Sequence, residues 1–283
     1  MSSQSNYREA VNRIYSSLKG KKRVIADRVL SEPIQMIEKS IADFARDCQC
    51  DQTTVVRFAQ MLGYSGYAEL KIAVARQSEA LWQEFNSNSM TSSAAEPKKK
   101  GNNVTESLMR IHCESITGTI RNLNDHALRK MITRIEKAER IMICGAGTSA
   151  LAAEDLSVKL SRQGIHTIFY RDPEMWKTFL GYLGRSDLLI LISNSGETPC
   201  VTELAKTARQ KKIPVAGIVS FPGSSLAKCA DILLLTENRG ELPIRLGAMT
   251  SRTAQFMIVD LLTILYSMEN RKKSWDYLEK SYV

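Results

Sequence analysis

The 283-residue sequence lacks the features of several classes of protein. It contains no unbroken apolar run of about 18 residues, so we expect no membrane-spanning helix and no membrane partner. The opening residues, MSSQSNYREAVNRIY, show no basic stretch followed by an apolar one, which argues against a secretory signal. We therefore expect a cytoplasmic protein.

Cysteine and histidine are sparse, with six and three residues respectively. Cys48-x-Cys50 is followed by no second Cys/His pair at zinc-finger spacing, so we expect no metal site. Cys48 lies on an apolar helix face and Cys144 in an apolar stretch, which indicates reduced thiols that fill a core. No motif surrounds any of the histidines, which are His112, His126 and His166.

Acidic residues are outnumbered by basic ones, 30 to 39, which gives a formal net charge of +9 at pH 7. A basic surplus favours an acidic partner such as nucleic acid, but solvated lysines on an ordinary surface give the same count. A DNA-binding hypothesis therefore has to depend on sequence pattern.

One stretch, NSNSMTSSAAEPKKKGNN over residues 86–103, is too poor in apolar residues to fold alone and is typical of a linker. It separates two parts of different pattern. We predict an all-helical domain over residues 1–80, a linker over 81–105 and an α/β domain over 106–283.

Four helices are predicted in the first domain. The first two are separated by Gly20, and Ser31-Glu32-Pro33 ends the second of them. The next two are short and amphipathic. Ser40 and Asp51 can each cap a helix, and Gly63 can close the second one. Two helices joined by about three residues form a helix-turn-helix. The apolar residues at helical spacing are Ile41, Phe44, Ala45 and Cys48, then Val55, Phe58, Ala59 and Leu62.

The second helix of this motif has a polar face of side chains that can bond to base edges or phosphates. Lys71 and Arg76 are weaker candidates for phosphate contacts. The alternative is a structural three-helix bundle whose polar face meets only water. The predicted DNA-binding residues are Gln52, Thr53, Thr54, Arg57 and Gln60.

The second domain alternates short apolar strands with amphipathic helices, which is typical of a parallel sheet covered on both faces. We therefore predict a three-layer α/β fold, in which the strands are apolar because both of their faces are buried. The predicted strands are residues 140–144, 166–170, 187–192, 214–219 and 231–235.

Glycine and hydroxyl residues gather in two loops that follow predicted strands. GAGTSA, residues 145–150, follows the first strand, and SNSGETP, residues 193–199, follows the third. In a doubly wound sheet both loops lie at the carboxyl edge, where ligands bind beside helix N-termini that favour anions. Hydroxyls there can donate to phosphate oxygens without adding negative charge. We predict a phosphate-binding site.

Other interpretations of these loops remain open. GAGTSA also fits a dinucleotide fingerprint, and Asp172 could then hold a ribose, but this does not explain the second loop. Alternatively, the hydroxyls only cap helices.

The two loops, GAGTSA with SNSGET, resemble a sugar isomerase (SIS) domain, a flavodoxin-like, phosphosugar-binding α/β fold. TTVVRFAQMLGYSGYAELK, residues 53–71, resembles the helix-turn-helix of the RpiR family of bacterial transcriptional regulators. SRTAQFMIVDLL, residues 251–262, is similar to the helix after the last strands in these regulators. The resemblance covers nearly the whole chain. Asp51 stands where many members carry Ser, and it remains a good cap.

The resemblance implies a DNA-binding regulator of carbohydrate catabolism genes, with amino sugars as a candidate class. It implies a sugar-phosphate effector without a cofactor, a palindromic DNA operator, and a homodimer or higher oligomer. Ser251 and Arg252 are candidates to close the ligand site, either of the same subunit or of the partner subunit. Alternatively, Arg252 forms an ion pair on the surface. The other ligand-site residues carried over are Gly147, Thr148, Ser149, Ser193, Asn194, Ser195 and Thr198.

The alternative of a different class is an SIS-type sugar-phosphate isomerase with an accessory helical domain. Isomerisation requires a base near the substrate carbon, for which Glu154, Glu174 and Glu197 are candidates. The predicted helix-turn-helix has no role in that enzyme, so we expect a regulator without catalytic residues.

Overall fold

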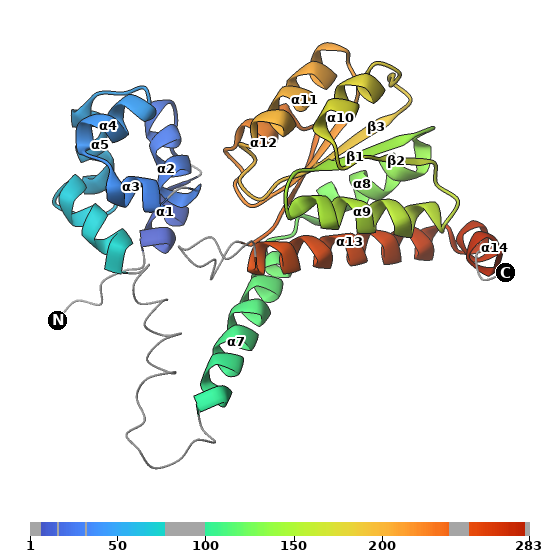
Figure 1. Cartoon of the computed structure of the whole chain (residues 1–283), viewed down its shortest axis with the longest axis horizontal. Helices are drawn as coiled ribbons and strands as arrows, with labels where there is room; N and C mark the ends of the chain where they lie inside the picture. Colours follow the sequence, from blue (N-terminus) through green and yellow to red (C-terminus); the bar gives the residue numbers. More distant parts are fainter. Residues whose placement is uncertain (1–6, 16, 32, 77–99, 238–248, 281–283) are drawn as a thin grey trace. The chain divides into compact units, whose positions relative to one another are not determined.

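The computed structural model describes residues 7–15, 17–31, 33–76, 100–237 and 249–280 (Figure 1). The chain divides into two compact units, and the main boundary falls between Leu108 and Met109. Most of the predicted linker, residues 81–105, lies outside the described residues, and residues 100–105 form the start of helix α7. Within the described ranges, no helix combines the length and apolar composition needed to cross a membrane.

The described residues of the first unit form helices joined by short turns, with no strand among them, which confirms the predicted all-α bundle. A further helix covers residues 67–76. Pro33 begins a short helix, since proline fits the first helical position. The sequence analysis did not predict this helix. The labelled helices are α1 (Tyr7–Tyr15), α2 (Lys21–Ser31), α3 (Pro33–Glu38), α4 (Ile41–Asp47) and α5 (Gln52–Met61).

Helices α4 and α5 form the predicted helix-turn-helix, and each begins at the predicted cap. The Ser40 side chain accepts a hydrogen bond from the Asp43 N–H at 3.2 Å, and Asp51 accepts one from the Thr54 N–H at 2.7 Å. The turn between them has Gln49 at φ 52°, in the left-handed region, where a glycine is the usual residue. A non-glycine residue costs about 1–2 kcal/mol there, which the surrounding packing offsets.

The second unit contains a five-stranded parallel sheet in the order β2-β1-β3-β4-β5. All five predicted strands are confirmed, each beginning one residue later than expected. The strands are β1 (Ile141–Gly145), β2 (Thr167–Phe169), β3 (Leu188–Ile192), β4 (Val215–Val219) and β5 (Ile232–Leu235).

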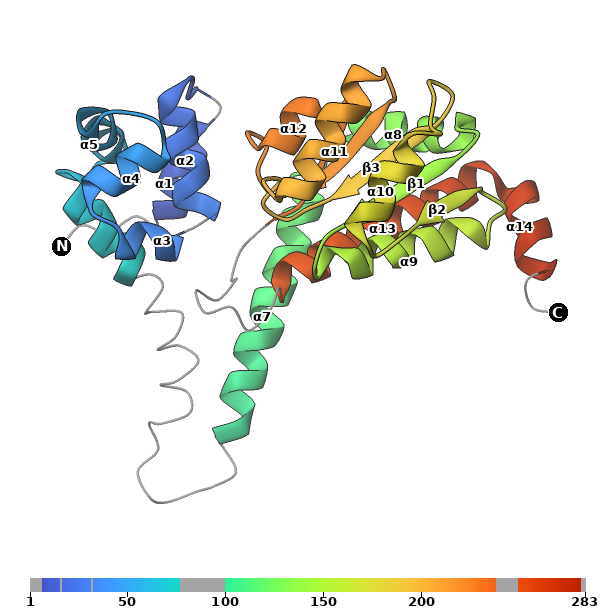
Figure 2. The same cartoon turned by 45° about the horizontal axis from the view of Figure 1, so that its top comes forward.

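Helices cover both faces of this sheet, which confirms the three-layer architecture (Figures 1 and 2). One face carries α8 (Asp125–Lys137), α9 (Ser149–Ser161) and α13 (Thr250–Glu269). The other carries α10 (Pro173–Leu180), α11 (Pro199–Gln210) and α12 (Ser225–Cys229). The remaining helices are α7 (Lys100–Arg121) and α14 (Arg271–Lys280).

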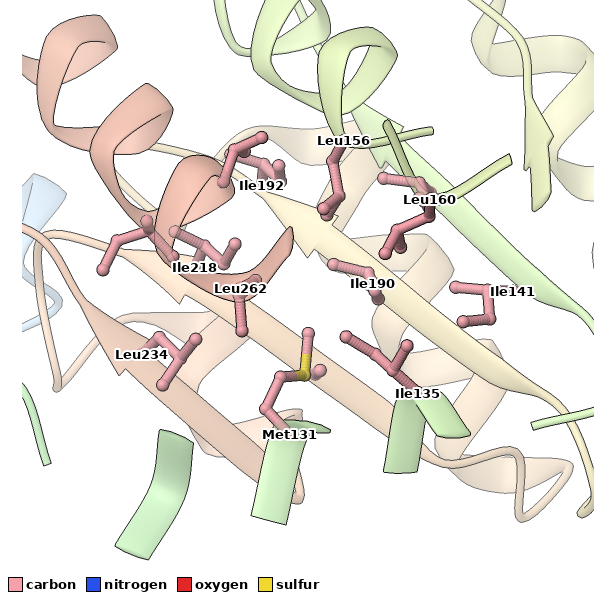
Figure 3. Close-up of a cluster of buried hydrophobic side chains, with 14 of the residues drawn as sticks. Met131, Ile135, Ile141, Leu156, Leu160, Ile190, Ile192, Ile218, Leu234 and Leu262 are labelled. Carbon is pink, nitrogen blue, oxygen red and sulfur yellow. The ribbon is translucent and has the colours of Figure 1, made fainter. Parts of the chain in front are cut away.

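Successive strand residues enter different cores because side chains alternate across a sheet. In β3, Ile190 and Ile192 face the core formed with α9 and α13, whereas Leu189 and Leu191 face the opposite core. Figure 3 shows the first core, where Ile190 and Ile192 lie near Leu156 of α9. Burial on both faces therefore explains the unbroken apolar run of this strand.

Candidate DNA-binding helix and ligand site

The predicted DNA-binding residues lie on the outer face of α5. Gln52, Thr53, Arg57 and Gln60 are exposed, opposite the buried stripe of the same helix. Thr54 differs, because it is half-buried and its hydroxyl donates to the Asp51 carboxylate at 2.7 Å. Gln52, Thr53 and Arg57 are thus open to a partner. Gln60 donates its Nε2 to the Ser65 carbonyl at 3.5 Å, and Thr54 is engaged in the helix cap.

Two charged residues near this helix have structural partners. Hydrogen bonds from the Thr54 hydroxyl and N–H lower the pKa of Asp51, so this carboxylate stays ionised at neutral pH. Lys71 donates its Nζ to the Lys39 carbonyl at 3.1 Å, whereas Arg76 is exposed. The ammonium of Lys71 therefore already has a hydrogen-bond acceptor within the unit, which weakens the prediction that Lys71 contacts a DNA phosphate.

The two hydroxyl-containing loops start side by side. Strands β1 and β3 are neighbours, and Gly145 at the end of β1 pairs with Ile192 at the end of β3. The sheet order reverses between these strands, because β2 lies on one side of β1 and β3 on the other. Such a switch point is where ligands bind in open α/β sheets. We call residues 145–149 and 193–198 the strand-edge site.

The loop after β1 depends on its glycines. A Cβ at Gly145 would lie 2.5 Å from the Ser149 carbonyl oxygen, so a side chain there would clash with the start of α9. Gly147 is exposed and has φ +58°, which favours glycine. Thr148, at the N-cap of α9, makes no side-chain capping bond. The backbone of this loop can therefore approach a ligand closely.

The loop after β3 holds its hydroxyls in a hydrogen-bonded turn. The buried Ser193 Oγ accepts from the Gly196 N–H at 3.1 Å and lies 3.2 Å from the Thr198 Oγ1. The Ser195 Oγ accepts from the Glu197 N–H at 3.2 Å. The hydroxyl oxygens that accept these bonds keep their protons for another acceptor. The loop therefore presents hydroxyl donors whose positions are fixed by hydrogen bonds within the loop.

The segment after β4 supports this loop, which the sequence analysis did not foresee. Ser220 donates to the Asn194 side-chain oxygen at 2.5 Å. A Cβ at Gly196 would lie 2.2 Å from the Ser224 Oγ, so the two loops pack in direct contact. The Ser225 N–H donates to the Glu197 carboxylate at 2.7 Å. No local sequence signal pairs these residues, because the two segments meet only in the folded sheet.

The first turns of α13 also approach the site. Gln255 is buried and donates to the Ser149 Oγ at 3.1 Å, which links α13 to the start of α9. Ser251 is buried one turn earlier, and Arg252 is half-buried without a salt bridge to any other described residue. The sequence analysis missed Gln255, although its spacing of four from Ser251 was an available signal.

Most side chains on which the dinucleotide-binding and isomerase alternatives depend have structural partners. Asp172, the candidate ribose ligand, caps α10 and accepts from the Glu174 N–H at 2.9 Å. Of the candidate bases, Glu197 holds the start of α12 and Glu154 forms a salt bridge with Arg171. Glu174 is exposed in the first turn of α10. These contacts give Asp172, Glu154 and Glu197 structural roles.

Possible metal ligands do not gather in the part of the chain that the structure describes. No group of three or more His, Cys, Asp or Glu residues is arranged there to hold a metal ion. The six cysteines are free thiols, and burial raises the pKa of Cys144, which keeps its thiol protonated at neutral pH.

Comparison with known proteins assigns both units. The model of the rpiR-family helix-turn-helix domain matches residues 5–80, and that of the SIS domain matches residues 134–265. An uncharacterized HTH-type transcriptional regulator of Thermotoga maritima is 30% identical over 272 residues, which cover 92% of this chain and 93% of that protein. The chain belongs to the RpiR family of transcriptional regulators. This RpiR-family regulator has the helix-turn-helix first and the SIS domain second, as predicted.

Solved structures share the fold of this RpiR-family regulator. The NanR protein of Vibrio vulnificus, complexed with ManNAc-6P, gives a TM-score of 0.63 at 23% identity, covering 98% of this chain and 97% of NanR. The sugar isomerase domain of an RpiR transcription factor from Sphaerobacter thermophilus gives a TM-score of 0.58 at 20% identity, covering 63% of this chain and 97% of that one. At these identities, the likenesses show the fold alone.

Proposed function

We propose that this RpiR-family regulator is a cytoplasmic protein that senses a sugar phosphate and controls genes of carbohydrate catabolism, amino-sugar genes being the favoured class. The observation that carries the proposal is the register of Gly145 with Ile192, which puts two hydroxyl-containing loops at the switch point of the sheet. The domains proposed are residues 1–80 for DNA binding and 106–283 for sensing.

The proposed DNA contact is the exposed face of α5, with its N-terminal residues in the major groove of double-stranded DNA. Gln52 and Thr53 would reach base edges, and Arg57 would bond to a base or the backbone. Thr54 and Gln60 complete the proposed set at the margin of this face. A homodimer or higher oligomer would present two such helices to a palindromic operator, because the symmetry of the protein is imposed on its site.

The proposed effector site is the strand-edge site with the start of α13. Its hydroxyls and backbone N–H groups would hold a phosphate, and the positive charge of Arg252 would balance part of the phosphate charge. The ligand of the solved NanR structure, ManNAc-6P, is a phosphorylated amino sugar, which supports this class of effector. The proposed residues are Gly147, Thr148, Ser149, Ser193, Asn194, Ser195, Thr198, Ser251 and Arg252.

The effector would act by binding one arrangement of the two units more tightly than another. A ligand changes a conformational equilibrium only through this difference in affinity, which is typically about 1–3 kcal/mol for coupled sites. The proposal requires no catalytic residue, metal or cofactor.

A pair of variants tests whether the two sites are separate. Full-length protein would first select duplexes from random DNA, where enrichment of an inverted repeat is expected. Arg57→Ala should weaken binding to the selected duplex by about 5- to 150-fold, the value of one good base contact, and leave ligand binding unchanged. Ser193→Ala with Ser195→Ala should abolish ligand stabilisation and retain DNA binding.

Ligand binding would be measured as a thermal shift with ManNAc-6P and with a panel of other sugar phosphates, with inorganic phosphate as a control. A saturating ligand at 100 times its Kd stabilises by about 2.7 kcal/mol. Fluorescence of the buried Trp176 reports whether the double variant is folded. Selection of no DNA, or an unchanged ligand response in the folded double variant, would contradict the proposal.

The isomerase alternative has a direct assay. Incubation of the protein with hexose 6-phosphates and detection of ketose products would separate the two functions. We expect no turnover, because Glu154 and Glu197 are engaged in structural contacts. Turnover that is lost in Glu197→Gln would establish an enzyme.

A further inference from the structure

A basic hollow lies beside α5, the proposed recognition helix. It has a volume of about 430 Å³ and is open to solvent. One wall is residues 17–22, which end the turn after α1 and begin α2, and the other wall is α5. Residues 17–22 carry three lysines and are called the lysine segment. The residues that line it are Ser17, Leu18, Lys19, Lys21, Lys22, Thr54 and Met61.

The hollow follows one edge of the proposed DNA-binding face. Thr54 and Met61 are seven residues apart, so they lie on the same side of α5, two turns from each other. Thr53, Arg57 and Gln60 occupy the neighbouring, exposed side. The lysine segment therefore flanks the polar face along most of the length of α5.

A second observation places one lysine near the start of α5. Burial, the largest effect, raises the pKa of Cys50, and the charge of Lys21 acts in the opposite direction. Cys50 immediately precedes the cap residue Asp51. The ammonium of Lys21 is therefore close enough to influence the N-terminal end of the recognition helix.

The charges of Lys19, Lys21 and Lys22 are not neutralised within the described part of the chain, where none of the three forms a salt bridge. Arg23, the next residue, behaves differently. Its guanidinium lies 3.6 Å from the centre of the Tyr15 ring and donates to the Tyr15 carbonyl at 2.5 Å. Arg23 thus ties α2 to α1, whereas the three lysines remain available to a partner.

We propose that the lysine segment, through Lys19, Lys21 and Lys22, binds the sugar–phosphate strand of the operator that borders the major groove occupied by α5. The inference rests on the proposed DNA-binding function. A helix in the major groove has a phosphate strand along each side, so a row of cations at the edge of its polar face lies where phosphates pass. Lysine ammonium groups bind phosphates as point charges without selecting a base.

The test is a triple variant, Lys19→Gln, Lys21→Gln and Lys22→Gln, in the full-length chain. The matched control is Lys206→Gln, Lys211→Gln and Lys212→Gln, which removes the same charge from exposed positions of α11 and the turn after it. Affinity for a selected duplex and for a scrambled duplex would be measured between about 50 and 200 mM salt, the range over which phosphate contacts change affinity steeply.

Each phosphate contact contributes about 0.9 to the slope of log K against log salt concentration, so the triple variant should lose about 2–3 from the slope per bound protomer. It should weaken the selected and the scrambled duplex by the same factor, on the order of 100-fold at low salt. The control variant should keep the wild-type slope. Lys→Arg at the same three positions should restore it, which separates charge from folding.

A slope equal to that of the control variant would overturn the inference and leave the proposed function standing. A larger loss on the selected duplex than on the scrambled one would also overturn it, because base readout would then be the role of the lysine segment. A wild-type chain that binds no DNA would overturn both.

Discussion

The exposed face of α5 and the strand-edge site are both polar, but they differ in how their side chains are held. Gln52, Thr53 and Arg57 on α5 project into solvent, without fixed partners among the described residues. Ser193 and Ser195 are instead held by backbone N–H groups of their own loop. A surface for long DNA can adjust its side chains on contact, whereas a site for a small anion gains from donors that are already ordered.

The two regions also differ in how they would attract an anion. Lys19, Lys21 and Lys22 beside α5 carry full charges. Salt screens these charges beyond a Debye length of about 8–10 Å. The strand-edge loops offer neutral hydroxyls and helix N-termini, whose effect is short-range. The first region suits a partner with many phosphates, and the second suits a partner with one.

The largest expected effect tests the two faces of α5. Phe58 is fully buried next to the exposed Arg57. Phe58→Ala should destabilise the helix-turn-helix by about 3–5 kcal/mol because it leaves a cavity, and DNA binding should be lost through unfolding. Arg57→Ala should leave stability within about 0.5 kcal/mol. Circular dichroism during urea unfolding measures both, and equal destabilisation would contradict the assignment of faces.

The next effect separates the two strand-edge loops. Gly196 has φ +67° and faces Ser224, whereas Gly147 has φ +58° with open space around it. Gly196→Ala should cost about 2–4 kcal/mol, because backbone strain and a clash add together. Gly147→Ala should cost only about 1–2 kcal/mol of strain. Urea unfolding followed by Trp176 fluorescence compares them, and a larger cost at Gly147 would show that the packing of the two loops is misassigned.

The smallest effect contrasts a charged pair with a buried carboxylate at the amino edge of the sheet with an exposed pair between α10 and α11. Burial tends to raise the pKa of Asp187, but hydrogen bonds from Arg140 and the Gly184 N–H outweigh it, and the pKa lies below its ordinary value. Asp187→Asn should cost about 1–2 kcal/mol at pH 7. Glu203→Gln, in an exposed pair with Lys177, should change stability by less than about 0.5 kcal/mol.

The pH dependence of this effect has a defined sign. A carboxyl whose pKa is lower in the folded state stabilises the fold above its unfolded pKa, near 3.9, and this contribution is lost as the pH falls through the folded value. The difference between wild type and Asp187→Asn should therefore be full at pH 7 and shrink below about pH 4. A difference that grows on acidification would contradict the hydrogen bonding assigned to Asp187.

Local pattern was enough to predict most of the elements. The helix caps at Ser40 and Asp51 could be predicted because capping depends on side chains within one turn of the helix start. The five strands could be predicted because each is a short apolar run. Helix α3 was missed because a proline after an apolar helix also fits a simple helix end. The assignment of the site residues remains a prediction that the proposed variants test.

The sequence by itself determined the two kinds of unit, their order and the hydroxyls at the strand ends. Only the tertiary structure decided what meets across long separations. It brought Gln255 to Ser149, Ser220 to Asn194 and the lysine segment to the edge of α5. The physical reason is that strand pairing and core packing join segments that are far apart in the chain. The periodicity of one segment does not indicate which other segment it will contact.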